Sequence, residues 1–363
     1  MLAYTISSFI SIAITCIFKK RNLKILLLSC APLFLIAALR QFVGTDYASY
    51  YYNKIPVILE NPVQLEFGFS LLGYFSVVVL GSYQWLIAGM ALITCFCYWS
   101  AIFRYSKNIP LTILIFLALG CYYFSLNGMR QSVVIAIFFY ALKFIEKKKL
   151  KKYLLCILLA FSFHSVALLY IPFYWITRVR VTSKQIFLGS FFLYVIYPIV
   201  SSIVYPIILG KYAAYFSWGM KSGFNWRFLL PLLGLMLLDY MSKMDKFVLQ
   251  LPKTDYLNII RNLSIFSFWA CNLAPTLTGA SAARVIYFFL PAAAIYFPYV
   301  LQLGKRIKVI VSLFFVAIFF WTTNEGLGGI LPYHTVFSDY KKTYRSYIYE
   351  VNHSDDMNFR LNN

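Results

Sequence analysis

The sequence predicts an all-α polytopic membrane protein with about ten spanning helices and one or two re-entrant or broken segments. The chain of 363 residues is 61% hydrophobic, and its mean hydropathy is +0.72. Several apolar runs approach the roughly 20 residues that cross a hydrocarbon core about 30 Å thick. Short basic loops separate about twelve such segments, a pattern that the buried helices of a soluble protein do not show.

The first apolar segment, residues 2–18 (LAYTISSFISIAITCIF), is predicted to be an uncleaved anchor with its start on the outer side. It lacks the basic stretch that opens a signal peptide, and the basic sequence KKRNLK follows it. The second apolar run, residues 26–39, stops at Arg40. We assign residues 1–321 to one transmembrane domain and residues 322–363 to a polar C-terminal tail, because no repeat or low-complexity linker divides the chain.

The net charge of +21 indicates how the chain is oriented in the membrane and does not indicate nucleic-acid binding. Lys and Arg fall in short loops between the apolar segments, as they do on the cytoplasmic side of membrane proteins. We therefore place all the basic loops inside and expect no nucleic-acid partner. These loops are residues 19–24, 104–108, 146–152, 177–184, 242–246 and 304–308.

Two apolar segments fail to cross the membrane if all the basic loops share one side. Residues 67–82 are short and follow directly on Glu66 in the sequence EFGF. Residues 153–176 would enter and leave on the cytoplasmic side, with a break near the sequence FSFHS, which contains His164. Broken helices occur at membrane depth where they line an enclosed or wet cavity.

The seven cysteines predict packing rather than redox chemistry. All of them lie in or beside apolar runs, without metal-ligand or disulfide spacing. We therefore expect neither metal binding nor redox chemistry from them. His334 and His353 fall in the polar tail and are interpreted as surface residues.

Unusual polar residues gather in the loops assigned to the outer side, which are 40–51, 125–132, 221–228 and 278–285. Three of these loops share a design in which a capping-type residue precedes an arginine by less than one turn: Asn127 and Arg130, Asn225 and Arg227, Ser281 and Arg284.

A cation at the start of a helix opposes the helix dipole unless an anion lies above it. The planar fork of arginine holds phosphate oxygens in pairs, so the three helix starts together predict a pyrophosphate site. The alternative is that each arginine reaches out to lipid headgroups.

Three blocks of the sequence resemble, in order and spacing, the EpsG-like branch of the Wzy-type polysaccharide polymerases. The blocks are GTDYASYY, the stretch from NGMRQS to FSFHSVALLYIPFY, and ARVIYFF. The resemblance covers most of residues 38–300. Its most specific part is the N-x-x-R-Q block that is followed by a basic loop and then by an F-H-x-S-A-type block; Val166 stands where alanine often follows the serine.

The resemblance implies a multi-pass enzyme of the bacterial inner membrane, of the GT-C-like glycosyltransferase class. Such an enzyme joins undecaprenyl-diphosphate-linked oligosaccharide repeats on the outer, periplasmic side, in O-antigen, lipopolysaccharide or exopolysaccharide biosynthesis. It needs no metal or nucleotide sugar. The implied partners are the lipid-linked oligosaccharides, membrane lipid, and a flippase and a chain-length regulator of the same pathway.

Two other functions remain open alternatives. A lipid-linked oligosaccharide flippase or transporter would also carry arginines in a cavity, but two related halves would be expected. A membrane-bound O-acyltransferase would use a histidine as base, but its thioester donor would come from the cytoplasm, where outward arginines would have no use.

For the polymerase, Arg130 and Arg284 are the strongest candidates to hold the lipid diphosphate, with Arg227 and Arg40 behind them. The candidates for sugar binding are Asn127, Gln131, Tyr47 and Tyr50. The tyrosines are equally compatible with an aromatic belt at the membrane interface.

His164 and Asp46 are the candidates for the general base that activates the incoming sugar hydroxyl. We favour His164, because partial burial should hold it neutral, whereas neighbouring arginines should favour the charged form of Asp46. The alternatives are structural. Asp46 would then cap or salt-bridge Arg40, and His164 would be a packing histidine bonded to a neighbouring helix.

Overall fold

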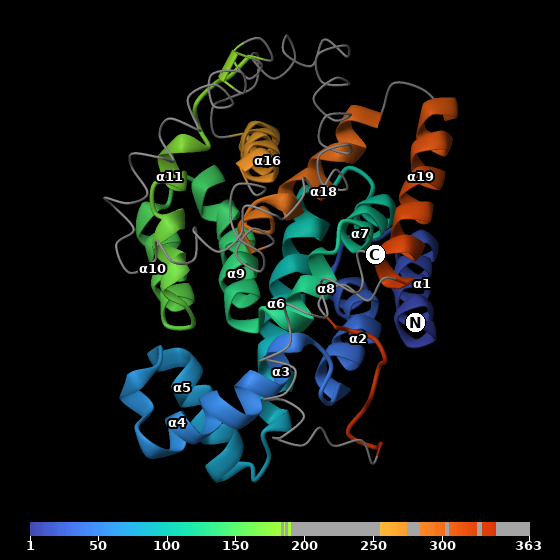
Figure 1. Ribbon diagram of the computed structural model, residues 1–363. Coiled ribbons are helices and arrows are strands. Elements are labelled where there is room, and N and C mark those ends of the chain that lie inside the picture. The colour runs from blue at the N-terminus through green and yellow to red at the C-terminus, as the bar shows by residue number, and fades with distance from the viewer. Residues whose placement is uncertain are drawn as a thin grey trace.

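The structure of the protein, a computed structural model, is an assembly of packed helices (Figure 1). It describes residues 1–182, 185, 188–189, 255–273, 284–301, 305–324 and 329–338. Within these residues no strand forms, and one isolated bridge pairs Arg40 with Thr335. The all-α prediction is therefore confirmed for the part of the chain that is described.

Two long helices, α6 (Gln84–Tyr105) and α9 (Met129–Glu146), form the centre of the bundle. α6 packs against α9 and α2 (Leu23–Leu39), and α2 packs against α1 (Leu2–Ile17). α9 is buried along most of its length, as expected from its middle part, residues 133–139, which is apolar on all sides. At a rise of about 1.5 Å per residue it reaches from one end of the bundle to the other.

The remaining helices surround this centre. α7 (Ile109–Ala118) and α8 (Cys121–Asn127) form a pair bent by 51°. α16 (Tyr256–Leu273) packs against α18 (Leu290–Val300), and both α18 and α19 (Lys305–Asn324) pack against α7.

Few of the described helices are both long enough and apolar enough to cross a membrane alone. By length and composition α6 is, and so is the bent pair of α7 and α8 if it is counted as one span. Several shorter apolar helices have 10–17 residues, among them α1, α2 and α18. The number of about ten spanning helices and the GT-C-like class therefore remain predictions.

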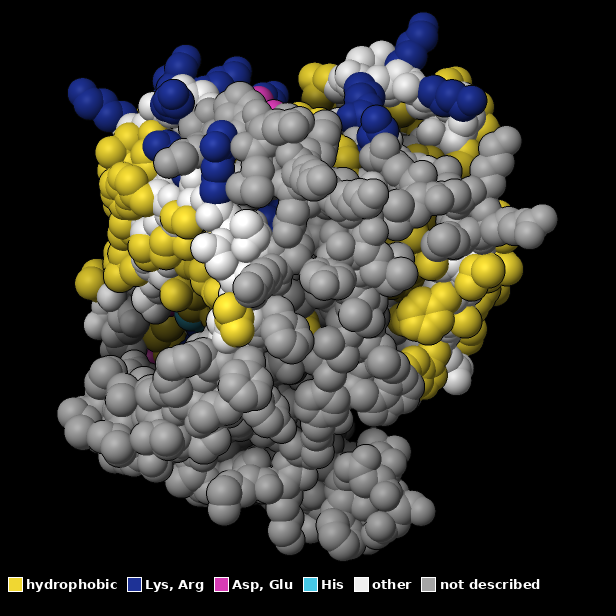
Figure 2. All heavy atoms as spheres, turned by 90° about the horizontal axis from the view of Figure 1, so that it is seen from above, with side chains coloured by type: hydrophobic (Ala, Val, Ile, Leu, Met, Phe, Trp, Pro, Cys, Tyr) yellow, Lys and Arg dark blue, Asp and Glu magenta, His cyan; other side chains and the backbone are white. Residues whose placement is uncertain are grey.

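The basic loops meet at one end of the bundle, which we call the basic end. Arg21 donates to the backbone oxygens of Phe103 and Ser106, at 3.2 and 2.7 Å, and Arg104 forms an ion pair with Glu146 at 2.8 Å. Figure 2 shows Lys and Arg side chains gathered along one edge of the surface. The loops 19–24, 104–108 and 146–152 thus share one side, as predicted, whereas loop 242–246 lies outside the described residues.

The break predicted near FSFHS is confirmed. Helix α10 (Leu150–Phe161) ends just before it, and the 3-10 helix η4 (Ser165–Tyr170) begins just after it. The hydroxyl of Tyr153 donates to the backbone oxygen of Tyr170, so the chain folds back beside α10. Short helix α11 (Phe173–Ile176) continues this return.

The other exceptional segment, residues 67–82, stays away from the basic end. It forms α5 (Phe67–Tyr74) and a π-helical turn (Phe75–Val79), beside α4 (Ile55–Glu60). Figure 1 shows α4 and α5 projecting together from the bundle, next to α3 (Thr45–Ser49).

Residues 329–338 pack against the end of α2 and the loop that follows it. The amide of Gly44 donates to the oxygen of Gly329 at 3.0 Å, and the amide of Gln41 donates to the oxygen of His334 at 2.9 Å. α19 continues to Asn324, past the predicted domain boundary at residue 321. The described start of the predicted tail is therefore attached to the helical domain.

Candidate functional site

The site is built around the start of α3, where the chain turns sharply at Gly44. Its φ of +94° lies in a region that favours glycine, and a β-carbon there would lie 2.9 Å from the backbone oxygen of Leu126. Glycine therefore allows the first turn of α3 to lie against the end of α8. This contact places Asp46 beside Asn127.

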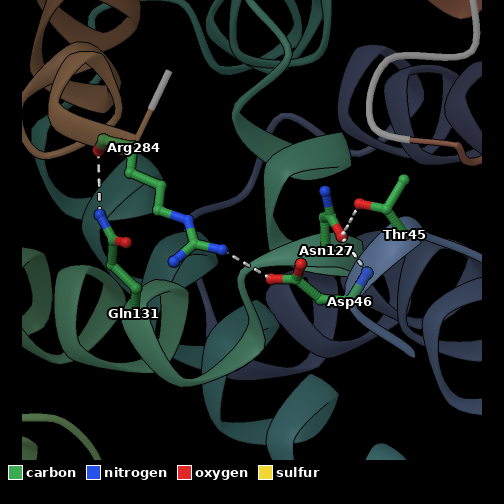
Figure 3. A network of polar contacts seen from close by, with 5 residues as sticks. All are labelled: Thr45, Asp46, Asn127, Gln131 and Arg284. Atoms are coloured by element: carbon green, nitrogen blue, oxygen red, sulfur yellow. Dashed lines mark hydrogen bonds and ion pairs between the residues drawn. The ribbon is translucent and has the colours of Figure 1, made fainter. Parts of the chain in front are cut away.

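Asn127 fixes the first turn of α3 (Figure 3). Its Oδ1 accepts a hydrogen bond from the amide of Asp46 at 2.8 Å and another from the Thr45 hydroxyl at 3.0 Å. It thus satisfies one of the amides that a helix start leaves without a partner. The prediction that Asn127 caps the helix carrying Arg130 is wrong, because Asn127 is the last residue of α8 and α9 begins after Gly128.

Asp46 and Arg284 form the first ion pair of the site. Arg284 Nη2 lies 3.1 Å from Asp46 Oδ2, and the side chains are 47% and 27% exposed. Gln131 Nε2 donates to the backbone oxygen of Arg284 at 2.9 Å and so ties that residue to the first turn of α9 (Figure 3). The charged partner of Asp46 is therefore Arg284 and not Arg40.

Arg130 and Glu66 form the second ion pair, between the first turn of α9 and the residue before α5. The Arg130 guanidinium carbon also lies 5.2 Å from the ring centre of Phe69 and 5.9 Å from that of Tyr50. Ring faces attract a cation and restrict its position. Arg130 Nε is buried without a hydrogen-bond partner, so this guanidinium has at least one N–H donor that is not used.

Glu66 is a site residue that the sequence reasoning did not identify. The start of α5 is held against the break in FSFHS, because the amides of Gly68 and Phe69 both donate to the backbone oxygen of Ser162, at 2.7 and 3.2 Å. A β-carbon on Gly68 would clash with the Ser162 hydroxyl. This close contact places Glu66 near His164. In the sequence, only the short stretch EFGF indicated that the chain is unusual at this point.

His164 lies in the break between α10 and η4. Burial lowers its pKa, nearby Arg130 and Arg284 lower it further, and Glu66 opposes them. This shift favours the neutral form of the imidazole. Its Nδ1 accepts the amide of Val166 at 3.2 Å, which assigns the ring proton to Nε2. In this tautomer Nε2 donates a proton and does not accept one.

The pKa of Asp46 shifts in the direction opposite to the one predicted. Burial raises its pKa, and Arg284 and Arg130 lower it by less, so the pKa lies above its ordinary value. The arginines were expected to dominate because the loop was assumed to be wet. The folded loop instead encloses the carboxyl group, and desolvation disfavours its charged form.

Arg40 lies apart from these two ion pairs. Its side chain is 1% exposed, and its Nε and Nη2 are buried without hydrogen-bond partners. Its backbone oxygen accepts from Gln84 Nε2 at 3.1 Å. Among the described residues the Arg40 side chain is enclosed, and its role in binding the lipid diphosphate remains a prediction.

The tyrosines of GTDYASYY turn inward. Tyr47 is buried against Phe42 and Tyr83, with ring centres 5.1 and 5.6 Å away, and Tyr50 is buried against Phe69. Their role in sugar binding remains a prediction. Arg227, Asn225 and Ser281 lie outside the described residues.

A cavity of about 730 Å³ opens beside the second ion pair. Its polar walls include Arg130 and Glu66, and its other walls come from the start of α5 and the last turn of α10. The lining residues are Gln64, Leu65, Glu66, Phe67, Arg130, Leu158, Phe161 and Ser162. In the described part of the chain, no three His, Cys, Asp or Glu residues are grouped so that they could hold a metal ion.

Comparison with known proteins gives one match. The family described as the EpsG family matches residues 23–335, which contain every described residue of both ion pairs. No curated protein and no solved structure matches the chain.

Proposed function

The chain belongs to the EpsG family, a Wzy-like polymerase family, and we propose that it joins lipid-diphosphate-linked oligosaccharide repeats by glycosyl transfer. The reaction would take place on the outer face of the bacterial inner membrane, with undecaprenyl diphosphate as the carrier. The observation that carries this proposal is the pair of arginine–carboxylate contacts beside His164, at the end of α9 opposite the basic end.

Arg130 and Arg284 would stabilise the diphosphate as it leaves. Breaking the bond between the sugar and the phosphate develops negative charge on the phosphate oxygen, and fixed cations lower the free energy of that transition state. Each guanidinium has five N–H donors, and each contacts its carboxylate through one nitrogen atom in the ion pairs described above. Donors therefore remain for phosphate oxygens.

Asp46 is the better candidate for the general base. Its raised pKa makes it a stronger proton acceptor than an ordinary aspartate. In the proposed step a hydroxyl of the acceptor sugar attacks the anomeric carbon of the donor sugar and gives its proton to Asp46. The new glycosidic bond forms, the bond to the phosphate breaks, and the lipid diphosphate leaves with the bonding electrons.

His164 would act as a hydrogen-bond donor in this reaction. With Nδ1 occupied by the amide of Val166, the Nε2 proton is directed to another acceptor. In the proposed reaction, a phosphate oxygen of the lipid diphosphate would be that acceptor. Asn127 and Gln131 would serve as positioning residues, since they hold Asp46 and Arg284 respectively.

The glycan of a strain that lacks this protein tests the proposal against a flippase. Without a polymerase, single repeats remain on the lipid carrier on the outer side of the membrane. Without a flippase, they remain on the inner side. Long chains in the deletion strain, or repeats trapped inside, would contradict the proposed function. Restoration of long chains by the wild-type gene controls for effects on neighbouring genes.

The glycan of the same deletion strain also distinguishes a polymerase from an O-acyltransferase. Loss of an acyltransferase leaves the chain length unchanged and removes an ester-linked group. Loss of a polymerase removes the long chains themselves. Chain length and ester content, measured on one preparation, therefore distinguish the two reactions.

A further inference from the structure

The cavity between α5 and α10 joins a charged end to an apolar opening. Arg130 and Glu66 lie in its wall, and Phe67, Leu158 and Phe161 line it on the other sides. Its volume of about 730 Å³ is in the range of about 300–1,000 Å³ that is typical of ligand sites. A ligand that fits both parts has an anionic head and a hydrocarbon chain.

The apolar lining continues onto the outer surface of α10 and α5. Leu158 is 63% exposed and Phe67 is 73% exposed, although both are large apolar residues. Leu155 and Leu159 extend the same surface along α10. In a membrane protein such a surface contacts hydrocarbon, so the cavity opens sideways to lipid as well as toward the ion pair.

The depth of the opening agrees with this direction. Leu158 lies eight residues beyond Leu150, the first residue of α10, and so about 12 Å along the helix axis from the basic end. This distance is less than the roughly 30 Å of a hydrocarbon core. The opening is therefore at a height where a lipid chain, and not water, is its neighbour.

We propose that this cavity is the lateral binding site for the polyprenyl diphosphate carrier, with the isoprenoid chain along Phe67, Leu158 and Phe161 and the diphosphate at Arg130. This assignment rests on the proposed function for the identity of the carrier. A diphosphate carries more negative charge than the Glu66 carboxylate and competes with it for the guanidinium. The unpartnered Nε of Arg130 supplies a further donor.

Photocrosslinking from two positions on α10 tests the site. Leu158 and Leu155 are both 63% exposed, but only Leu158 lines the cavity. The full chain, with p-benzoylphenylalanine at one of the two positions, is placed in phosphatidylglycerol vesicles with radiolabelled undecaprenyl diphosphate. We expect about tenfold more capture from position 158, which corresponds to about 1.4 kcal/mol of binding preference. Arg130→Ala should reduce that capture to the level seen from position 155.

Two results would overturn the proposal. One is equal capture from both positions, and the other is equal capture at position 158 of undecaprenol, which has no diphosphate, since bulk hydrocarbon would then fill the cavity. The probe carries no sugar, so capture does not depend on glycosyl transfer. Loss of polymerase activity and loss of the lateral site are thus separate outcomes.

A kinetic comparison gives an independent reading. Leu158→Trp should raise the concentration of lipid-linked repeat needed for half-maximal polymerisation about tenfold, equivalent to about 1.4 kcal/mol, and should leave the maximal rate little changed. Leu155→Trp is the matched control and should behave as wild type. Equal behaviour of the two variants would place the isoprenoid chain elsewhere.

Discussion

Arginine–carboxylate pairs occur at both ends of the molecule, and their surroundings differ. At the basic end, Arg104 donates to Glu146 through both Nε and Nη2, at 3.1 and 2.8 Å. These two residues join the ends of α6 and α9 on the surface. At the other end, Arg130 and Arg284 each hold a carboxylate near the half-buried His164, and the Arg130–Glu66 pair lines a cavity.

The comparison shows that an ion pair alone does not define a site. A surface pair such as Arg104–Glu146 contributes about 0–1 kcal/mol to stability and has no reason to affect chemistry. Arg130 has ring faces against its guanidinium, and Asp46 has a carboxyl group whose pKa is shifted by burial. These features hold charged groups in place for a reaction. Variants at the two ends therefore test which pairs serve function.

The largest effect is expected from Asp46→Asn. An amide cannot accept the proton of the sugar hydroxyl, so polymerisation should fall by about 10²- to 10⁴-fold. The rate is measured as the release of lipid diphosphate from lipid-linked repeats. Glu146→Gln, which removes the carboxylate of the basic-end pair, is the control and should leave the rate unchanged.

The same substitution should not destabilise the fold. The folded-state pKa of Asp46 is raised, so its contribution to stability is present below the ordinary pKa of about 3.9 and is lost as the pH rises past the folded value. At neutral pH an uncharged asparagine therefore costs no ionic stabilisation. A large drop in the melting temperature of Asp46→Asn would make Asp46 a structural residue instead.

Arg284→Gln should reduce the rate by about ten- to a hundredfold, because one cation at the diphosphate is lost. It should also change the pH profile. Arg284 lowers the pKa of Asp46 against the effect of burial, so its removal raises that pKa further. As the pH falls, activity should then be lost at a higher pH than in wild type. Arg104→Gln should shift neither the rate nor the profile, and an unshifted profile in Arg284→Gln would separate Asp46 from the titration.

His164→Gln distinguishes a donor from a base. Glutamine donates a hydrogen bond through its amide but does not take up a proton near pH 7. If His164 is a donor, His164→Gln should retain more than about a tenth of the wild-type rate and His164→Ala should retain less. Equal, complete inactivity of both variants would return the role of base to His164.

Asn127→Ala should have the smallest effect, mainly on stability. Loss of its bond to the amide of Asp46 removes a helix-start contact worth about 0.5–2 kcal/mol. Asn108 is the matched control, because its side chain accepts from the amide of Leu111 at the start of α7, at the basic end. Both variants should unfold at lower temperature, but only Asn127→Ala should also lose activity. Equal activity losses would remove Asn127 from the site.

The pattern of charge and hydropathy was sufficient to place Asp46, Arg130, Arg284 and His164 in one region. The charge of the loops predicted that these polar residues lie on one side of the membrane. The break at His164 was predicted from the rule that all basic loops lie on the other side. The contact of Glu66 with Arg130 was not predictable, because the two are 64 residues apart and meet only when α5 rests on the break.

Burial was the other quantity that the sequence did not provide. Arg40 and Arg130 both lie in polar stretches that were assigned to the outer side, yet the Arg40 side chain is enclosed and Arg130 lines a cavity. Burial also reversed the expected direction of the pKa shift of Asp46. Neighbouring residue types indicate which charges are near one another, but the packed structure decides how much water reaches them.

One measurement tests the central claim most directly: polymerisation by the purified chain in lipid vesicles, with undecaprenyl-diphosphate-linked repeats as the sole substrate. Arg130→Lys keeps the charge but loses the planar fork, so the ladder of long products should fall about a hundredfold or more. Arg104→Lys makes the same change at the basic end and should give the wild-type ladder. Equal ladders from the two variants, at equal amounts of folded protein, would contradict the assignment of the reaction to the end of the molecule that holds Arg130.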